Sequence, residues 1–401
     1  MTDPSDAALP AGRRALAPLG ILLTAVMMVA STAQFGLGAL APAIRADLSL
    51  SNSQFGLLNS VFFLSVAFFS VILPKALAQI REHTAFVSVS VLMVAGMGIV
   101  AVAVNSLYVV PGLMLAAVAT AAANPITNRA VLATGQAREP LIAIKQSGVA
   151  LATIVCGAVL PSLATLTDWR VAVFSYTVSV GSVPLLLLRW TGTRKTKPPP
   201  ARPSGSTGRY SILQVVVYAL LMGTGGAAVS TYLAFYIHTE LAVDVVMAGL
   251  VFSCVGVGAI AGRFLWGPLA IRAIRRGGHL QHQLLVMALI ATVATAGLIA
   301  SVWGGVPLAA VCAWLLGMSA SSWNPLGMMI AAASGDPALT MRTSGLIMLG
   351  FFTGLGLGPP GYGLLADRYG HTVGWSATLV VFACAGAMMS RRTDKQHPPA
   401  V

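Results

Sequence analysis

Residues 107–131 read LYVVPGLMLAAVATAAANPITNRAV and contain one charged side chain, Arg129, close to the end. About 20 apolar residues in a helix are enough to cross the hydrocarbon core of a bilayer. Inside this run, Asn124 places an amide beside Pro125, a residue that breaks helices, and such a pair suits the orientation of a small organic ligand. The stretch therefore predicts a transmembrane helix that carries a candidate binding residue.

The whole 401-residue chain has the composition of this stretch. Apolar residues make up 57% of it and charged residues only 9%, against about 25% charged in soluble domains, so the chain lacks the polar residues that a surface in water needs. Its long apolar segments predict an all-α membrane protein with twelve transmembrane helices. We expect these helices at about 15–37, 54–73, 84–104, 107–131, 141–163, 170–189, 210–237, 245–268, 280–301, 305–333, 341–364 and 371–390.

Segment 190–209 divides the twelve helices into two sets of six. It holds four prolines between Pro198 and Pro203, among basic residues, which is typical of an extended, solvated linker. We expect a cytoplasmic tail at 1–14, an N-terminal six-helix bundle at 15–189, a basic Pro-rich cytoplasmic linker at 190–209, a C-terminal six-helix bundle at 210–390 and a cytoplasmic tail at 391–401.

The positive charges fall almost entirely on one side of this arrangement. With both termini in the cytoplasm, 21 Lys and Arg residues lie on the cytoplasmic side, and only Arg45, Arg170 and Arg368 lie on the other. Short loops of membrane proteins carry such an excess on the cytoplasmic face. We therefore expect a multi-pass protein of the cytoplasmic (inner) membrane with both termini inside. The net charge of +13 resides in these loops, which argues against a nucleic-acid partner.

The two halves repeat each other in sequence. Asn124-Pro125 is followed by Lys145-Gln146-Ser147-Gly148, and Asn324-Pro325 is followed at a similar distance by Arg342-Thr343-Ser344-Gly345. Internal repeats of this kind are expected of transporters whose two bundles rock about a site at their interface.

With this repeat, the chain resembles the major facilitator superfamily over essentially its whole length, and within it a bacterial branch of unassigned substrate. Gly267 and Arg272 fit the second copy of the family's loop signature, Gly-x-x-x-Asp-Arg, and Arg81 fits the first, whereas Ile80 and Ile271 stand where the family usually has Asp. The resemblance implies two pseudo-symmetric six-helix bundles that work by alternating access. It also implies that any cytoplasmic latch is built differently here. The candidate gating residues on that side are Arg81, Arg129, Arg263, Gly267 and Arg272.

A better match to the same signature, Gly363-Leu-Leu-Ala-Asp367-Arg368, lies at the outer end of the eleventh expected helix. An Asp-Arg pair ahead of Gly370 can cap and stop a helix. We therefore expect a turn there, without a role in gating.

Catalysis is not expected of this chain. Its six histidines lie in loops or at helix edges, its four cysteines lie in separate apolar segments, and no metal-ligand spacing or nucleophile–base motif is visible. We predict no enzyme activity, no metal and no cofactor. All eleven acidic residues fall in tails or loops, which argues against proton-driven export of cationic drugs through a buried carboxylate.

Two basic residues, Lys145 and Arg342, lie about one turn inside the fifth and eleventh expected helices. A cation at the centre of a membrane helix costs roughly 2.5 to 3.5 kcal/mol, so each needs a reason to be there. Either both side chains reach back to the cytoplasmic headgroups, or two cations from opposite halves form a clamp for a carboxylate or phosphate group.

Polar and aromatic side chains within the expected helices are the further candidates for substrate binding. Each of them has packing between helices as its alternative role. With the two cations, the predicted set is Gln34, Asn124, Lys145, Gln146, Tyr218, Tyr232, Tyr236, Trp323, Asn324 and Arg342.

These observations predict a secondary transporter that moves a small organic solute, with an organic anion such as a carboxylate favoured by the buried cations and the absence of buried acids. Two alternatives stay open: an exporter of uncharged or amphipathic compounds, and a membrane sensor or receptor that transports nothing. The expected partners are a small-molecule substrate and the lipid bilayer, and the expected state is a monomer.

Overall fold

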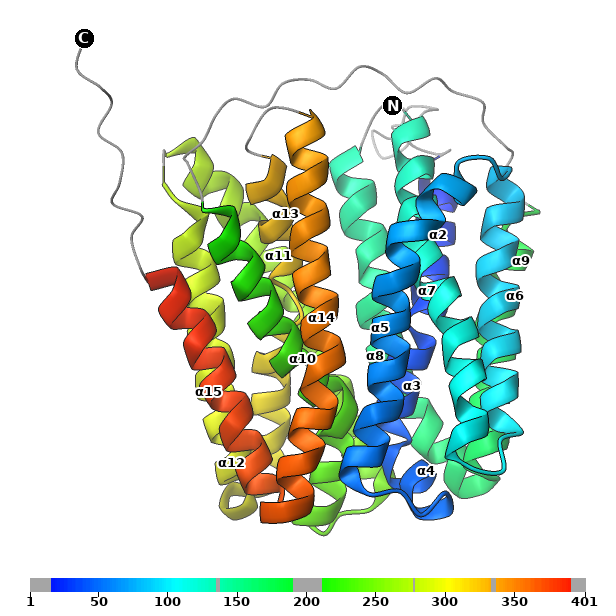
Figure 1. The fold of residues 1–401 in the computed structure, drawn as a ribbon, viewed down its shortest axis with the longest axis vertical. Coiled ribbons are helices and arrows are strands. Elements are labelled where there is room, and N and C mark those ends of the chain that lie inside the picture. Colours follow the sequence, from blue (N-terminus) through cyan, green and yellow to red (C-terminus); the bar gives the residue numbers. More distant parts are fainter. Residues whose placement is uncertain (1–15, 135–137, 190–210, 277, 333–336, 391–401) are drawn as a thin grey trace, which may run out of the picture.

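The computed structural model describes residues 16–134, 138–189, 211–276, 278–332 and 337–390. The expected tails at 1–14 and 391–401 and the linker at 190–209 lie outside these residues. Helices and short turns make up the described part, and no strand occurs in it. The helices run side by side along the long axis of the molecule (Figure 1). The expected all-α membrane fold is therefore confirmed.

The N-terminal half begins with a helix that is bent rather than straight. The expected helix at 15–37 consists of α2 and α3, which meet at an angle of 51° near Ser31. The hydroxyls of Ser31 and Thr32 donate to the carbonyls of Met27 and Met28, one turn earlier, and bonds of this type accompany many helix bends. This half consists of α2 (Leu16–Ala30), α3 (Thr32–Ala39), α4 (Ala41–Asp47), α5 (Asn52–Leu77), α6 (Glu82–Ala101), α7 (Ser106–Ala133), α8 (Arg138–Leu166) and α9 (Trp169–Leu187).

The C-terminal half contains one element, α12, that is two helices joined at Gly305. Gly305 has a φ of 71°, a value that glycine adopts at little cost. At about 1.5 Å per residue, the whole apolar stretch Leu280–Ala331 is far too long for one span. This half consists of α10 (Ile212–Glu240), α11 (Val245–Arg275), α12 (Leu280–Ser319), α13 (Asn324–Ala332), α14 (Pro337–Tyr369) and α15 (His371–Ser390).

Nine of the described helices are long and apolar enough to cross a membrane, or ten with the bent pair α2–α3 counted as one span. Dividing α12 at Gly305 and adding α14 makes the arrangement consistent with twelve spans. The tenth expected helix, 305–333, is broken at 320–323, between the second part of α12 and α13. Pro325 contributes to this break because it has no backbone N–H to donate and restricts the residue before it.

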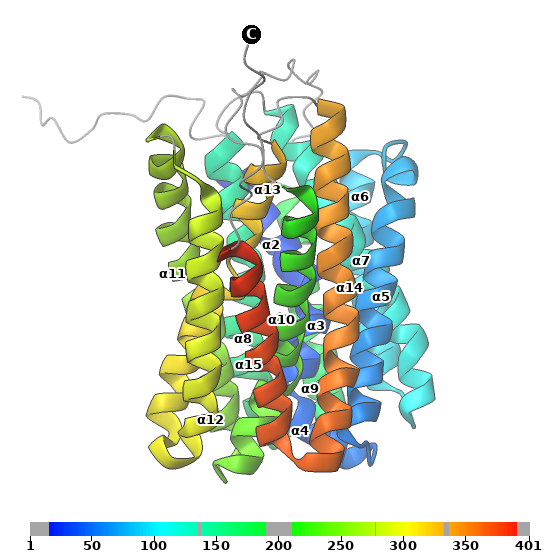
Figure 2. The same cartoon turned by 60° about the vertical axis from the view of Figure 1, so that its left-hand side comes forward.

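The two halves meet mainly along two pairs of helices, α5 with α14 and α8 with α11, and α10 also contacts α3 and α4 of the other half. Helix α14 packs on α10 of its own half and on α5 of the other (Figure 2). Ser60 of α5 donates a hydrogen bond to the Gly356 carbonyl of α14, and Ser253 of α11 donates to the Ile154 carbonyl of α8 at 2.9 Å. These bonds lie toward one end of the bundle, which we call the closed end and define by α4, the N-terminus of α5 and the C-terminus of α14.

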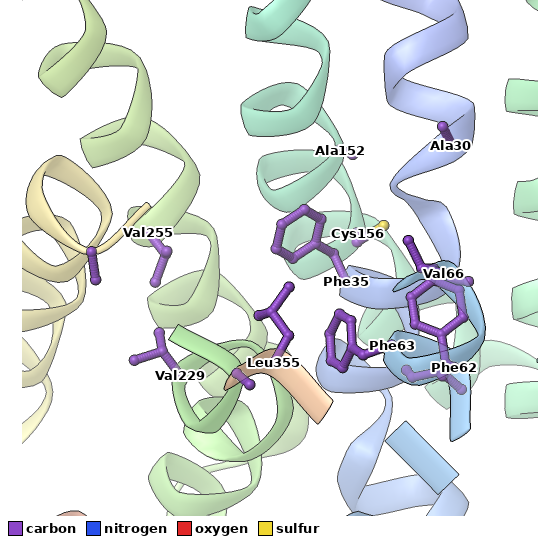
Figure 3. Packing of buried hydrophobic residues seen from close by; sticks show 14 of the residues in the cluster. Ala30, Phe35, Phe62, Phe63, Val66, Ala152, Cys156, Val229, Val255 and Leu355 are labelled. Carbon is purple, nitrogen blue, oxygen red and sulfur yellow. The ribbon is translucent and has the colours of Figure 1, made fainter. Parts of the chain in front are cut away.

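Apolar side chains fill the space between the halves. Leu355 of α14 points toward Phe35 of α3 and Phe63 of α5, which belong to the other half, and all three are buried (Figure 3). Phe35 also meets Phe252 of α11, with ring centroids 6.4 Å apart. The seam between the halves is therefore sealed by hydrocarbon as well as by hydrogen bonds.

Candidate functional site

Lys145 does not reach toward the end of its helix but points across to α7. Its side chain is only 1% exposed, and Nζ donates to Asn128 Oδ1 at 2.6 Å, Thr127 Oγ1 at 3.0 Å and Asn124 Oδ1 at 3.3 Å. An ammonium has three donors, so all three are used. Gln146 Nε2 also donates to Asn124 Oδ1, at 3.3 Å. We call these five residues the Lys145 cluster.

The spacing on α7 explains how the cluster forms. Asn124, Thr127 and Asn128 stand at positions i, i+3 and i+4, which place them on one face of a helix. The side chains of Asn124 and Asn128 are exposed, and both lie within the last ten residues of the candidate membrane span Ser106–Ala133. Thr127 and Asn128 were not among the candidates predicted from the sequence. Their spacing of three and four residues from Asn124, which places them on the same helix face, could have identified them.

No described carboxylate forms an ion pair with Lys145. Among the described residues, one ion pair occurs, between Arg170 and Asp47 at 2.6 Å, and it lies at the closed end within the N-terminal half. Burying a charge without an opposite charge is expensive even when hydrogen bonds stabilise it. The Lys145 cluster is thus a positively charged site lined by neutral amides and a hydroxyl.

Two basic residues of the C-terminal half, Arg342 and Arg263, differ in burial and in their position relative to the Lys145 cluster. Arg342 of α14 is exposed. Arg263 of α11 is half-buried, and one of its terminal nitrogens is fully buried without a hydrogen-bond partner. Helices α8 and α11 pack antiparallel so closely that a Cβ on Gly256 would lie 2.6 Å from the Ala150 carbonyl. Continuing this register away from the closed end places residue 261 opposite Lys145, so Arg263 lies within about two residues of the level of Lys145 along the helix axis.

Asn324 and Trp323 lie at the break before α13. The Ser322 hydroxyl lies 3.0 Å from the Gly317 carbonyl, in the last turn of α12, and 3.2 Å from the Ala259 carbonyl of α11. It thus provides a donor for the end of α12 and joins that end to α11. Trp323 is buried. Asn324 is half-buried and makes a weak contact from Nδ2 to Met348 Sδ at 4.0 Å. The break thus presents the Asn324 amide beside buried aromatic packing.

The three candidate tyrosines are packing residues in this conformation. Tyr218, Tyr232 and Tyr236 are 0% exposed. Their hydroxyls donate to backbone carbonyls, those of Leu284 for Tyr218 and Leu298 for Tyr236, while Tyr232 bonds backbone at the closed end. They therefore have no free donor facing a cavity here. Gln34, the remaining candidate of this set, is half-buried in α3.

The candidate gating residues lie near the end opposite the closed end. Arg129 donates to the Leu77 carbonyl at 2.7 Å, so it bonds the last residue of α5 and braces that helix end. Arg81 precedes α6 as its N-cap residue, without a side-chain cap bond, and Arg272 is exposed in the last turn of α11. Gly267 has open space where a side chain would stand. None of these cations forms an ion pair among the described residues, although Glu82, the first residue of α6, interacts electrostatically with Arg129.

A model of the Major Facilitator Superfamily matches residues 22–304, more than half of the chain. The chain belongs to this superfamily. It is therefore a member of a family of membrane transporters, and the arrangement of two helical halves is the family's fold. No curated protein sequence matches it.

Solved transporter structures share the fold at low sequence identity. A bacterial homologue of the human lysosomal transporter Spinster, inward-facing and unoccupied, aligns with a TM-score of 0.69 and 17% identity over 95% of this chain and 96% of that one. The nucleoside transporter NupG aligns with a TM-score of 0.70 and 12% identity, over 94% and 100%. A D-xylose–proton symporter gives 0.69 and 13%, over 93% and 97%. These similarities show the fold alone, so the class of substrate has to be inferred from the residues of the site.

Proposed function

We propose that this protein is a secondary carrier of a small organic anion, such as a carboxylate, and that it works by alternating access between its two halves. The observation that carries the proposal is the buried ammonium of Lys145, which is surrounded by neutral oxygens and has no acidic partner among the described residues. An anionic ligand would supply the missing opposite charge.

The amides around Lys145 suit this role. Asn124 and Asn128 use their oxygens to accept from Nζ, which turns their NH₂ groups away from it. Both side chains are exposed, so these NH₂ groups are able to donate to a ligand. A carboxylate bound there would receive amide hydrogen bonds together with the attraction of the nearby ammonium.

The C-terminal half contributes a second cation in this proposal. Arg263 lies near the level of Lys145 on the opposing helix and has one unpaired buried nitrogen, and its planar guanidinium favours bidentate contact with a carboxylate. Arg342, the partner expected from the repeat, stays a candidate, but it is exposed on α14. A ligand held from both halves would couple binding to their relative motion.

The exporter of uncharged or amphipathic compounds is the second candidate, and one observation favours it. All three donors of Lys145 are already used, so the residue is able to act as a brace between α8 and α7 without touching a substrate. In that case neutral compounds bind as well as anions.

We further propose a monomer in the cytoplasmic (inner) membrane, with both termini inside and without enzymatic activity. The excess of Lys and Arg in the loops at the end away from α4 supports this orientation.

A ligand screen tests the proposal. Purified protein is heated with a panel of carboxylates, sugars, amines and lipophilic dyes, and a ligand that binds the folded state raises the melting temperature. We expect carboxylates to stabilise the wild type and to lose this effect in Lys145→Gln. Arg275→Gln, which removes an exposed cation in the last turn of α11, is the matched control. Stabilisation by neutral compounds alone would favour the exporter.

A further inference from the structure

All the backbone N–H groups at the N-terminus of α5 have hydrogen-bond acceptors, and two of these acceptors belong to the other half of the protein. The Ser51 hydroxyl accepts from Gln54 N at 3.2 Å, and Gln54 Oε1 accepts from Ser51 N at 2.9 Å. These two bonds form a capping box. The remaining donors, Asn52 N and Ser53 N, bond to the two carboxylate oxygens of Asp367, each at 2.8 Å.

Asp367 stands in the last turn of α14, so these two hydrogen bonds cross the seam between the halves. The sequence pattern around Gly363 and Asp367 predicted a turn without a role in gating, and that prediction concerned only the helix on which Asp367 stands. The structure shows that the carboxylate caps a helix of the opposite half instead. A carboxylate at a helix N-terminus gains both from hydrogen bonds and from the positive end of the helix dipole.

The neighbouring contacts make this junction tight. A Cβ on Gly363 would lie 2.6 Å from the Asn52 carbonyl oxygen, so only glycine lets α14 approach this closely. One turn deeper, the Tyr232 hydroxyl lies 2.7 Å from the Asn52 carbonyl and 2.8 Å from the Pro359 carbonyl, joining α10, α5 and α14. Separation of α5 from α14 and α10 would break the contacts of Asn52 with Gly363 and Tyr232 together, whereas the bond between Tyr232 and Pro359 stays within one half.

We propose that Asp367 and Gly363 form a latch that holds the closed end shut and biases the carrier toward the state seen here. The latch acts between the halves: when the closed end opens, Asn52 N and Ser53 N lose their acceptors and Asp367 leaves the helix dipole. Because it depends on the motion of the two halves and not on the solute, the inference goes beyond the proposed substrate class.

Asp244 provides an internal comparison. Its carboxylate accepts from Val246 N and Met247 N, both at 2.9 Å, and so caps α11 at the same end of the bundle. Asp244 and α11 belong to one half, however. Loss of this cap weakens a helix end without affecting the seam, and Asp244→Asn is therefore the matched control for Asp367→Asn.

Distances between spin labels test the latch in the full-length protein. Labels are attached to cysteines at Ala46 and Thr372, which are exposed near the closed end on opposite halves, after Cys254→Ser and Cys384→Ser. We expect Asp367→Asn to raise the ratio of long to short distances by about 2- to 30-fold, the range that follows from loss of a charged helix cap. Asp244→Asn should leave the distribution unchanged. Equal distributions in the wild type and Asp367→Asn, or an equal shift in Asp244→Asn, would overturn the proposal.

A second pair of variants keeps the test independent of charge. Gly363→Ala places a methyl group against the Asn52 carbonyl, whereas Gly361→Ala, two residues earlier on α14, meets no atom within 4 Å. We expect Gly363→Ala to populate the long distance and Gly361→Ala to behave as the wild type. A short distance retained in a folded Gly363→Ala protein contradicts the latch. Neither result depends on whether a carboxylate binds at Lys145, so failure of the latch and failure of the anion proposal are separate outcomes.

Discussion

Replacement of Lys145 by Gln removes the charge of the candidate site while keeping a polar side chain. An anion that accepts from the NH₂ group of Asn124 or Asn128 would lie about 6–7 Å from Nζ, given the 2.6 and 3.3 Å bonds to the amide oxygens and an ordinary hydrogen bond to the ligand. At that distance, and with an effective dielectric constant of about 20, two unit charges attract by about 2–3 kcal/mol. We therefore expect the Kd for a carboxylate to rise by about 30- to 150-fold.

Titration calorimetry on the purified protein measures this change, with the best carboxylate from the stability screen. A neutral analogue, such as the corresponding amide, should bind the wild type and Lys145→Gln with similar affinity, since it gains nothing from the charge. The melting temperature of each variant without ligand shows whether the fold is intact. An unchanged Kd for the carboxylate in a folded Lys145→Gln protein would refute the electrostatic reasoning and make Lys145 a brace between helices.

Four further variants test the packing and the second cation. Arg263→Gln should weaken carboxylate binding at least 10-fold in the same titration, with a smaller effect for Arg342→Gln, and the reverse order would favour the pairing expected from the repeat. Gly157→Ala puts a Cβ 2.6 Å from the Gly249 carbonyl across the seam, so it should lower transport in reconstituted vesicles while the protein still folds; wild-type rates would show that this close approach is dispensable. Trp323→Ala leaves a cavity at a fully buried site and should destabilise the protein by about 3 kcal/mol, visible as a lower melting temperature without ligand.

The helical architecture was predictable because it depends on segment length and charge alone. Segments free of charge mark the spans, and the sequence repeat around Asn124 and Asn324 marks the two halves. The bend near Ser31 was not predicted, since a serine in a membrane helix bonds its own backbone in straight and bent helices alike. The break before Asn324 was indicated by Pro325, but its position depends on the bonds that Ser322 makes to α11 and α12.

The site was predictable only in part, for a related reason. Lys145 stands out because a buried cation needs a partner, whereas the identity of that partner depends on which helix faces it. Asp367 shows the same limit: its sequence context describes α14, and its function arises from the N-terminus of α5, more than 300 positions away in the chain. Contacts between distant segments are set by the packing of helices and have no local pattern.

The unbalanced charge of Lys145 also has an electrical consequence. In a carrier that exchanges its open side around a fixed ammonium, the charge of Lys145 is uncompensated during the change of access of the empty protein, whereas a bound monovalent anion neutralises it in the loaded protein. Moving a unit charge across a membrane potential of 100 mV changes its free energy by about 2.3 kcal/mol. The membrane potential would therefore change the rate at which the empty carrier returns and would have little effect on the change of access of the loaded carrier.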